Sequence, residues 1–442
     1  MTTEGYLRSR RVSRQHERDI GLPLRLATVL ICALVVLLPL MMGHRTPETL
    51  TASLLLMTLL ALTAAGMVAT WNGEIPMPGA GWLTVAGLMT VMVLIQVWPS
   101  ELLARWFGPY PDAVWRHPEF TPRHWSPDVG ASLRGWAAFV ALFAVAWLGR
   151  SLPRSLRNQV WMTVVAAALF QALYGLFSHA AGAESIFGVW ERNNPDFVHG
   201  SFSNRNLFAA YLALTWPLAV GIWYFRDVPG ISRMPVELRI TASVICGAVI
   251  GAAMLGSASR LGAAAGVFSI LLALILWGRH RRVIAGASAW PAYLAAAGAL
   301  VAATWYGLTP LAERLLATTG EEFRLEAFGI ILREFPWAWW IHGVGLGGFE
   351  AAFKPFQPAH VTGWVDYAHN DLLQWLIETG VVGLVILGIV TTALLRKARL
   401  DTERIALYAG LTALCVVALG DFSWHIPGTQ VVLAFFVGSL IR

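Results

Sequence analysis

Repeated apolar runs of about 17 to 25 residues constrain this chain more than any other feature of its sequence. A helix needs about 20 apolar residues to cross a bilayer, whereas a transmembrane barrel strand is about half as long and alternates polar with apolar residues. With 57% hydrophobic and 13% charged residues, the 442-residue chain is also too apolar to hide its side chains in a soluble core. We therefore expect an all-α polytopic membrane protein.

The distribution of arginine predicts how the chain crosses the membrane. Arginines recur in alternate loops of the apolar pattern, and such loops stay in the cytoplasm. The net charge of +6 therefore indicates membrane orientation, and we expect no nucleic-acid partner. With both termini cytoplasmic, about twelve spans fit without a conflicting loop. The predicted spans are 24–42, 49–71, 81–98, 131–148, 159–178, 206–225, 239–256, 262–278, 288–307, 370–395, 403–420 and 426–440.

These spans divide the chain into four parts. A basic cytoplasmic segment, 1–23, precedes nine spans over 24–308, a large outside loop over 309–369 and three spans over 370–442. In the large loop, apolar residues recur at helical spacing between 323 and 335, which predicts a helix along the outer interface. The three cysteines fall within predicted spans and are interpreted as core filling.

Outside the spans, polar residues gather in a few loops on the outer side. The aromatic-rich loop 99–130 is either an interfacial belt or a surface on which sugars stack. Asn204 and Asn206 precede a predicted helix and are expected to cap it or to line a site. Arg205 places a cation where the helix dipole is positive, so it needs an anion or a carboxylate partner. Arg260 lies in a tight turn at the membrane boundary, where it either snorkels to lipid phosphate or serves a function.

The large loop and the span after it carry the densest set of polar candidates. Arg324 lies on the predicted interfacial helix and either pairs with a neighbouring glutamate or faces a site. The glycines between 343 and 348 follow no predicted strand, so a tight turn explains them better than dinucleotide binding. His369 precedes a helix expected to begin at Asn370, whose amides and positive dipole end favour a phosphate group.

A polar stripe continues into this last group of spans. Asp371, Gln374 and Glu378 are three and four residues apart and so share one helix face. Glu378 lies about two turns into the span, where we expect an arginine partner or neutralisation by a proton. Asp421 and His425 return to the outside, where they either close the floor of the same cavity or, as is more common for a loop histidine near proline, are solvated or structural.

Four segments resemble the O-antigen ligase and polymerase superfamily of Wzy-type polymerases and WaaL-type ligases. They are Gly-Ser-Phe-Ser-Asn-Arg-Asn at 200–206, Ser-Ala-Ser-Arg at 257–260, and His369-Asn370 with Leu373, Glu378, Gly380 and Gly383. The fourth, Asp-Phe-Ser-Trp-His-Ile-Pro at 421–427, resembles exopolysaccharide-associated members and so favours a polymerase.

The resemblance implies a GT-C-like fold in the bacterial inner membrane and a periplasmic-face glycosyltransferase. The donor would be an undecaprenyl-diphosphate-linked glycan, and the acceptor hydroxyl would belong to a second glycan or to lipid A core. Transfer would be inverting and independent of a metal ion, and we expect no cofactor. Membrane lipids and a chain-length regulator protein are the other implied partners. A lipid-linked glycan transporter and a non-catalytic scaffold are remoter alternatives.

The residue types fit this chemistry on their own. Breaking the bond from the anomeric carbon to phosphate leaves negative charge on a lipid diphosphate, which arginines or a divalent cation can stabilise. Because the sequence contains no Asp-x-Asp motif, arginines are the candidates. We expect Arg260 and Arg324 to hold the diphosphate with help from Arg205. His369 would be the general base, or would donate to the leaving phosphate. Candidate supporting residues are Asn204, Asn206, Asn370, Tyr367, Glu378, Asp421 and His425.

Overall fold

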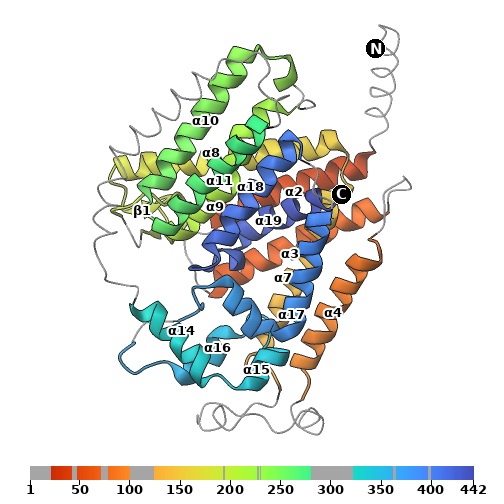
Figure 1. The fold of residues 1–442 in the computed structure, drawn as a ribbon, viewed down its shortest axis with the longest axis vertical. Coiled ribbons are helices and arrows are strands. Elements are labelled where there is room, and N and C mark those ends of the chain that lie inside the picture. Colours follow the sequence, from red (N-terminus) through yellow and green to blue (C-terminus); the bar gives the residue numbers. More distant parts are fainter. Residues whose placement is uncertain are drawn as a thin grey trace.

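The protein folds as a bundle of helices (Figure 1). The structure, a computed structural model, describes residues 21–41, 47–70, 78–99, 124–192, 195–225, 228, 230–279, 322–361, 365–396 and 400–442. One two-stranded antiparallel hairpin, β1 (Ser185–Ile186) and β2 (Trp190–Glu191), interrupts the helices among these residues. The α-helices are α2 (Leu22–Leu40), α3 (Pro47–Ala69), α4 (Ala80–Gln96), α7 (Val129–Ser151), α8 (Arg154–Ala180), α9 (Arg205–Gly221), α10 (Val236–Gly256), α11 (Arg260–Arg279), α14 (Glu322–Glu334), α15 (Trp337–His342), α16 (Phe349–Phe353), α17 (Asp371–Arg396), α18 (Thr402–Val417) and α19 (Pro427–Leu440).

Eight helices of the described residues are long and apolar enough to cross a membrane, namely α2, α3, α7, α8, α9 with its 3-10 extension to Tyr224, α10, α11 and α17. Helices α4 and α19 are apolar but shorter. These helices confirm the expected all-α polytopic membrane protein. The predicted span 288–307 lies outside the described residues, so the number of about twelve spans stays a prediction.

Helix α9 forms the centre of the bundle. Of its most apolar stretch 83% is buried, against 28% to 50% in the other candidate spans. It packs against α8, α10, α11 and α18 (Figure 1). Small residues allow close approach, because a Cβ added at Gly410 would overlap the carbonyl of Leu214 on α9. The position of α9, and of the residues at its start, is therefore fixed by its packing against four neighbouring helices.

Helix α17 is broken rather than continuous. Gly380 adopts φ 59° and ψ −155°, which interrupts the helical hydrogen bonds within the predicted span 370–395. The Val344 amide donates to the Ile377 carbonyl at 2.8 Å, and the Gly345 amide donates to the Glu378 carbonyl at 3.2 Å. These bonds satisfy the carbonyls that the break releases. Sequence periodicity did not predict the break, because its partners are distant in sequence.

The glycine-rich segment that fills this break is a tight turn, as expected. Gly343, Gly345 and Gly347 all have positive φ. Gly343 also lies so close to the α17 backbone that a Cβ there would overlap the Glu378 carbonyl. The Gln96 side-chain amide donates to that same carbonyl at 2.9 Å from α4. The glycines therefore serve close backbone packing.

The helix ends separate into two groups. The starts of α8 and α18 meet where Arg157 Nε lies 3.1 Å from Glu403 Oε1, and Trp277 near the end of α11 donates to the Thr402 carbonyl. The starts of α9 and α11 and the end of α18 therefore lie together at the opposite end. This agrees with the predicted alternation, while the side of the membrane on which each end lies stays a prediction of the positive-inside rule.

All three cysteines are free. Cys246 is buried and Cys32 is half-buried, in agreement with a packing role. Cys415 is exposed on the surface of α18, so its interpretation as core filling is wrong. A polarisable, weakly polar thiol is tolerated at an exposed helix position, and apolar periodicity alone does not distinguish such a position from the core.

Candidate functional site

His369 lies immediately before α17. Its backbone is left-handed, with φ 51°, which few residues other than glycine adopt without a constraint. Asn370 supplies that constraint: its Oδ1 accepts from the Leu373 amide at 2.9 Å and its Nδ2 donates to the Leu419 carbonyl at 3.1 Å. Asn370 is thus the cap of α17 and ties it to the end of α18, and the helix starts within one residue of the predicted position.

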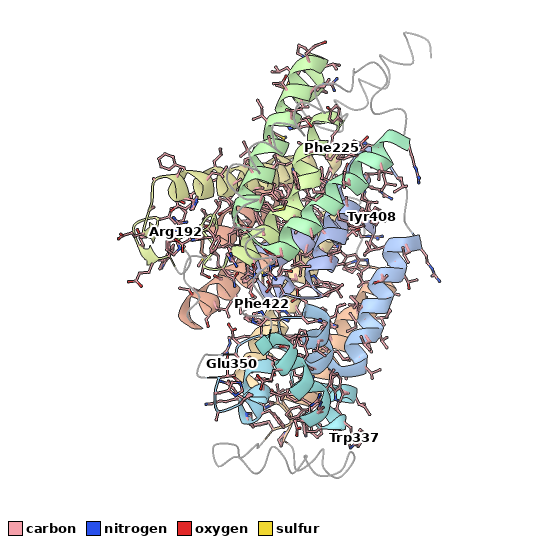
Figure 2. All side chains as sticks on the ribbon, turned by 60° about the vertical axis from the view of Figure 1, so that its left-hand side comes forward. Arg192, Phe225, Trp337, Glu350, Tyr408 and Phe422 are labelled. Carbon is pink, nitrogen blue, oxygen red and sulfur yellow. The ribbon has the colours of Figure 1, made fainter. Side chains whose placement is uncertain are left out.

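The His369 imidazole faces a carboxylate and an aromatic ring. Its Nδ1 lies 3.7 Å from Asp421 Oδ1, and its side chain is 26% exposed whereas that of Asp421 is 5% exposed. The ring meets Phe422 edge to face at 5.0 Å, and Phe422 stacks on Tyr367 at 4.3 Å. Phe422 lies where the helical bundle meets the α14–α16 segment (Figure 2). The structure therefore brings His369, Tyr367 and Asp421 together as one cluster with one accessible imidazole.

A second histidine lies against α17 beneath this cluster. His425 Nδ1 lies 2.7 Å from Oδ1 of the fully buried Asp371, and its Nε2 lies 3.9 Å from Glu378 Oε2. Asp371 Oδ2 also accepts from the Trp424 amide at 2.9 Å. The Asp371 carboxylate therefore holds the segment 421–425 against the start of α17. His425 is therefore held between two carboxylates of α17 in a structural contact, and its place in the floor of a substrate cavity stays a prediction.

Glu378 is satisfied differently from the sequence expectation. Its carboxylate accepts from the Gly347 amide at 2.8 Å and from the Gln374 side chain at 3.0 Å, with His425 beyond. Of the two expectations for Glu378, the arginine partner is wrong for the described residues, because the turn at 343–348 supplies a backbone donor instead, and neutralisation by a proton stays a prediction. The shared face of Asp371, Gln374 and Glu378 is confirmed, since Gln374 and Glu378 are in contact and His425 meets both carboxylates.

Arg205 begins α9 and lies on a neighbouring loop. Its guanidinium lies 4.1 Å from the centre of the Phe197 ring, and its Nη1 donates to the Ser257 carbonyl at 3.4 Å. No ion pair among the described residues joins Arg205 to a carboxylate. Asn204 caps the helix, because its side chain accepts from the Asn206 amide at 2.8 Å. Capping thus explains Asn204, and Asn206 contributes its backbone.

Arg260 begins α11 and lies close to this loop. The Val198 amide donates to the Gly256 carbonyl at 3.0 Å, and Arg205 binds the next carbonyl, that of Ser257. On the other side, Leu261 packs against Gly420, the residue before Asp421. The structure therefore gathers the loops of Arg205, Arg260 and Asp421 at one end of the bundle. Arg324 lies on α14, and its side chain lies outside the described residues.

Sequence reasoning missed a buried pair that shapes the loop before Arg205. Arg192 Nε donates to His199 Nε2 at 2.9 Å, and His199 Nδ1 lies 2.6 Å from the Phe202 carbonyl. Arg192 also binds the carbonyls of Ser178, Ala183 and Phe197. Burial, reinforced by the Arg192 charge, lowers the pKa of His199 to about 4. The imidazole is therefore neutral and accepts from arginine, which holds residues 195–202 against Arg192.

The described end of the aromatic loop 99–130 is structural. Trp125 is 2% exposed and donates from Nε1 to the Gly343 carbonyl at 3.1 Å. Its ring meets His342 edge to face at 4.1 Å. Neither the belt nor the sugar-stacking surface describes Trp125, which instead supports the turn against α17. Residues 100–123 lie outside the described part of the chain.

Comparison with known proteins identifies one part of the chain. Residues 244–388 match the family model Wzy_C, described as O-antigen ligase. The matched segment includes Arg260, His369 and Glu378, while Arg205 and Asp421 lie outside it. The searches of curated proteins and of solved structures found no match. Over residues 244–388 the chain is therefore similar to the Wzy_C family, and this match confirms its resemblance to the O-antigen ligase and polymerase superfamily.

Proposed function

We propose that this protein is a glycosyltransferase of the periplasmic membrane face that moves a glycan from an undecaprenyl-diphosphate-linked donor to a hydroxyl of a second glycan. It is then a polysaccharide polymerase of Wzy type. The observation that carries the proposal is the accessible His369 imidazole beside Asp421, at the start of α17. The Wzy_C match supports membrane glycan transfer in general terms.

In the proposed reaction, His369 acts as the general base. The acceptor oxygen attacks the anomeric carbon while its proton moves to the imidazole, and the bond from that carbon to the phosphate oxygen breaks. The electron pair leaves with undecaprenyl diphosphate, and the configuration at the anomeric carbon is inverted. Asp421, 3.7 Å from Nδ1, stabilises the positive charge that the imidazole gains. Nε2 is then the nitrogen that receives the proton.

Arginines hold the leaving diphosphate in this proposal. The loops of Arg205 and Arg260 adjoin at the start of α9 and α11, and the Arg205 guanidinium contacts the Phe197 ring and the Ser257 carbonyl. One guanidinium group can bind two phosphate oxygens at once through two parallel hydrogen bonds. The positive ends of the helix dipoles at the starts of α9 and α11 also attract the negative charge of the diphosphate. Arg324 is assigned to the same role from sequence. These groups stabilise charge that develops as the bond breaks.

A WaaL-type O-antigen ligase, which transfers the glycan to lipid A core, is the second candidate function. The description of the matched family favours it. Resemblance of the segment 421–427 to exopolysaccharide-associated members favours the polymerase. The two functions share the donor and the chemistry proposed here and differ in the acceptor, so the acceptor decides between them.

The proposal is tested with purified protein, a radiolabelled lipid-linked repeat unit and either a second repeat unit or lipid A core. A polymerase forms products that grow by whole repeats and releases undecaprenyl diphosphate, whereas a ligase labels only the core. Arg260→Ala and Arg205→Ala are expected to reduce turnover roughly 10²-fold. Arg279→Ala is the matched control, because Arg279 is an exposed arginine in the last turn of α11, at its opposite end. Absence of product from the folded wild-type protein with both acceptors contradicts the proposal.

A further inference from the structure

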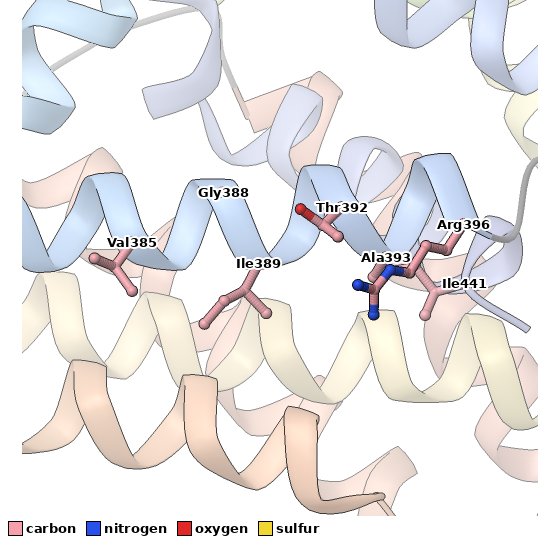
Figure 3. A pocket seen from close by; sticks show the side chains of 7 residues that line it. All are labelled: Val385, Gly388, Ile389, Thr392, Ala393, Arg396 and Ile441. Carbon is pink, nitrogen blue, oxygen red and sulfur yellow. The ribbon is translucent and has the colours of Figure 1, made fainter.

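A groove of about 570 Å³ lies along the second half of α17 (Figure 3). The His369 cluster lies at the other end of this helix. Its volume is in the range of small-molecule sites, roughly 300 to 1,000 Å³. One helix supplies most of the wall, at positions that recur every three or four residues. The lining residues are Val385, Gly388, Ile389, Thr392, Ala393 and Arg396 of α17, with Ile441 after α19.

The groove has the length of one membrane leaflet. From Val385 to Arg396 an α-helix rises about 16 Å, which is roughly half the 30 Å hydrocarbon core of a bilayer. Val385 is 49% exposed, and Gly388 and Thr392 are also exposed, so the groove opens outward. Because α17 crosses the membrane, the outward side of this groove faces lipid. Its apolar wall therefore fits a single acyl chain.

The end of the groove is basic. Arg396 and Ile441 lie together at that end (Figure 3), and Arg150 donates from Nη1 to the Ile441 carbonyl at 2.9 Å. Arg442 follows and donates to the Leu152 carbonyl at 3.3 Å. Burial first, and then the neighbouring arginines, lower the pKa of Arg442. The nearby carboxylate of Glu403 is already engaged by Arg157 at 3.1 Å, so a surplus of positive charge remains.

We propose that this groove binds an anionic phospholipid, with one acyl chain along α17 between Val385 and Ala393 and the phosphate at Arg396. Guanidinium groups at a leaflet boundary attract anionic headgroups, and an arginine next to a groove of acyl-chain length fixes both parts of the lipid. The inference rests on α17 crossing the membrane, with Arg396 on the basic side. It does not depend on the transfer chemistry, so its test has a readout of its own.

Native mass spectrometry of the detergent-purified protein, titrated with phosphatidylglycerol or phosphatidylcholine, measures this binding. The wild-type protein is expected to retain one more bound phosphatidylglycerol molecule than the Gly388→Leu variant retains. A Cβ added at Gly388 meets nothing within 4 Å, so the substitution begins in open space at the groove wall. Arg396→Gln is expected to lose about tenfold in affinity for phosphatidylglycerol and little for phosphatidylcholine.

Matched controls come from α11. A Cβ at Gly278 also meets nothing within 4 Å, and Arg279 is likewise an exposed arginine in a last turn. Gly278→Leu and Arg279→Gln are therefore expected to bind lipid as the wild type does. Equal phosphatidylglycerol binding by the wild type, Gly388→Leu and Arg396→Gln overturns the proposal. So does competition by free glycerol phosphate at the lipid's own concentration, or a wild-type dimer that Gly388→Leu converts to a monomer.

Discussion

Acidification is predicted to weaken the fold through one residue, His199. In the folded protein, Arg192 donates to its Nε2 and the Phe202 carbonyl accepts from its Nδ1, so the imidazole has no place for a second proton. Its pKa is lowered to about 4, first by burial and then by the Arg192 charge. In the unfolded chain a histidine has a pKa of about 6.5. The unfolded state therefore binds the proton first as the pH falls.

The sign and size of the effect follow from these two values. Between pH 6.5 and 4 the unfolded state holds more protons than the folded state, so stability falls as the pH falls through this window. The loss reaches about 2 kcal/mol at pH 5 and about 3 kcal/mol at pH 4, and its limit at lower pH is roughly 3 to 4 kcal/mol, because one pKa unit corresponds to about 1.4 kcal/mol. At pH 7.5 the contribution is nearly zero.

The assay compares thermal midpoints of detergent-purified wild type and His199→Gln at pH 7.5 and pH 5, at one scan rate. The variant is expected to lose less on acidification than the wild type, since glutamine does not titrate. His342, whose pKa burial also lowers to about 4, is present in both proteins and cancels in the comparison. His360→Gln is the control, because the His360 side chain is 67% exposed. An equal drop in wild type and His199→Gln would refute the reasoning.

Three further substitutions test the packing around the two ends of the bundle. Asp371→Ala is expected to lower stability by about 3 kcal/mol, because three donors lose a buried acceptor, whereas Asp196→Ala at the surface changes it by less than about 0.5 kcal/mol. Gly438→Ala is expected to lower the thermal midpoint, since its Cβ overlaps a carbonyl of α7, while Gly388→Ala has open space and leaves the midpoint unchanged or higher. Glu403→Gln leaves a buried arginine without its carboxylate and is expected to cost about 3 kcal/mol in chemical denaturation. Equal thermal midpoints for Asp371→Ala and Asp196→Ala, or for Gly438→Ala and Gly388→Ala, would contradict the contact in question. A wild-type denaturation curve for Glu403→Gln would do the same for the Arg157–Glu403 pair.

Much of the architecture was predictable from sequence, because bilayer thickness sets the length of a crossing helix. Eleven of the predicted spans coincide with helices of the structure to within a few residues. The cap of α17 was also predictable, since a short polar side chain at a helix start has a local partner. Such features depend on residues only a few positions apart.

The rest could not be predicted, because it depends on contacts across hundreds of residues. The break at Gly380 is stabilised by the Gln96 side chain, which donates to the Glu378 carbonyl from 282 positions away in the sequence. His425 reaches Asp371 over 54 positions, and one sequence without an alignment gives no sign of that pairing. The roles of Arg192 and His199 were missed for the same reason, although a histidine and an arginine seven positions apart in an apolar chain were a signal.

Among the candidate site residues, those within one loop were easier to place than those between loops. Sequence placed His369 beside a helix start, and the structure adds Asp421 at 3.7 Å. The adjacency of the Arg205 and Arg260 loops arises from α9 and α11 packing side by side, which periodicity does not reveal. Helix packing, rather than any local motif, therefore decides which of the proposed groups share a site.

Turnover of the purified His369→Ala protein on a lipid-linked donor tests the central claim most directly. His360→Ala is the paired control, because His360 is a histidine of the same segment between α14 and α17 and its side chain is 67% exposed. The account predicts a loss of roughly 10² to 10⁴-fold in undecaprenyl diphosphate release for His369→Ala, with an unchanged thermal midpoint, and wild-type release for His360→Ala. Release by folded His369→Ala within a few-fold of the wild-type rate would contradict it.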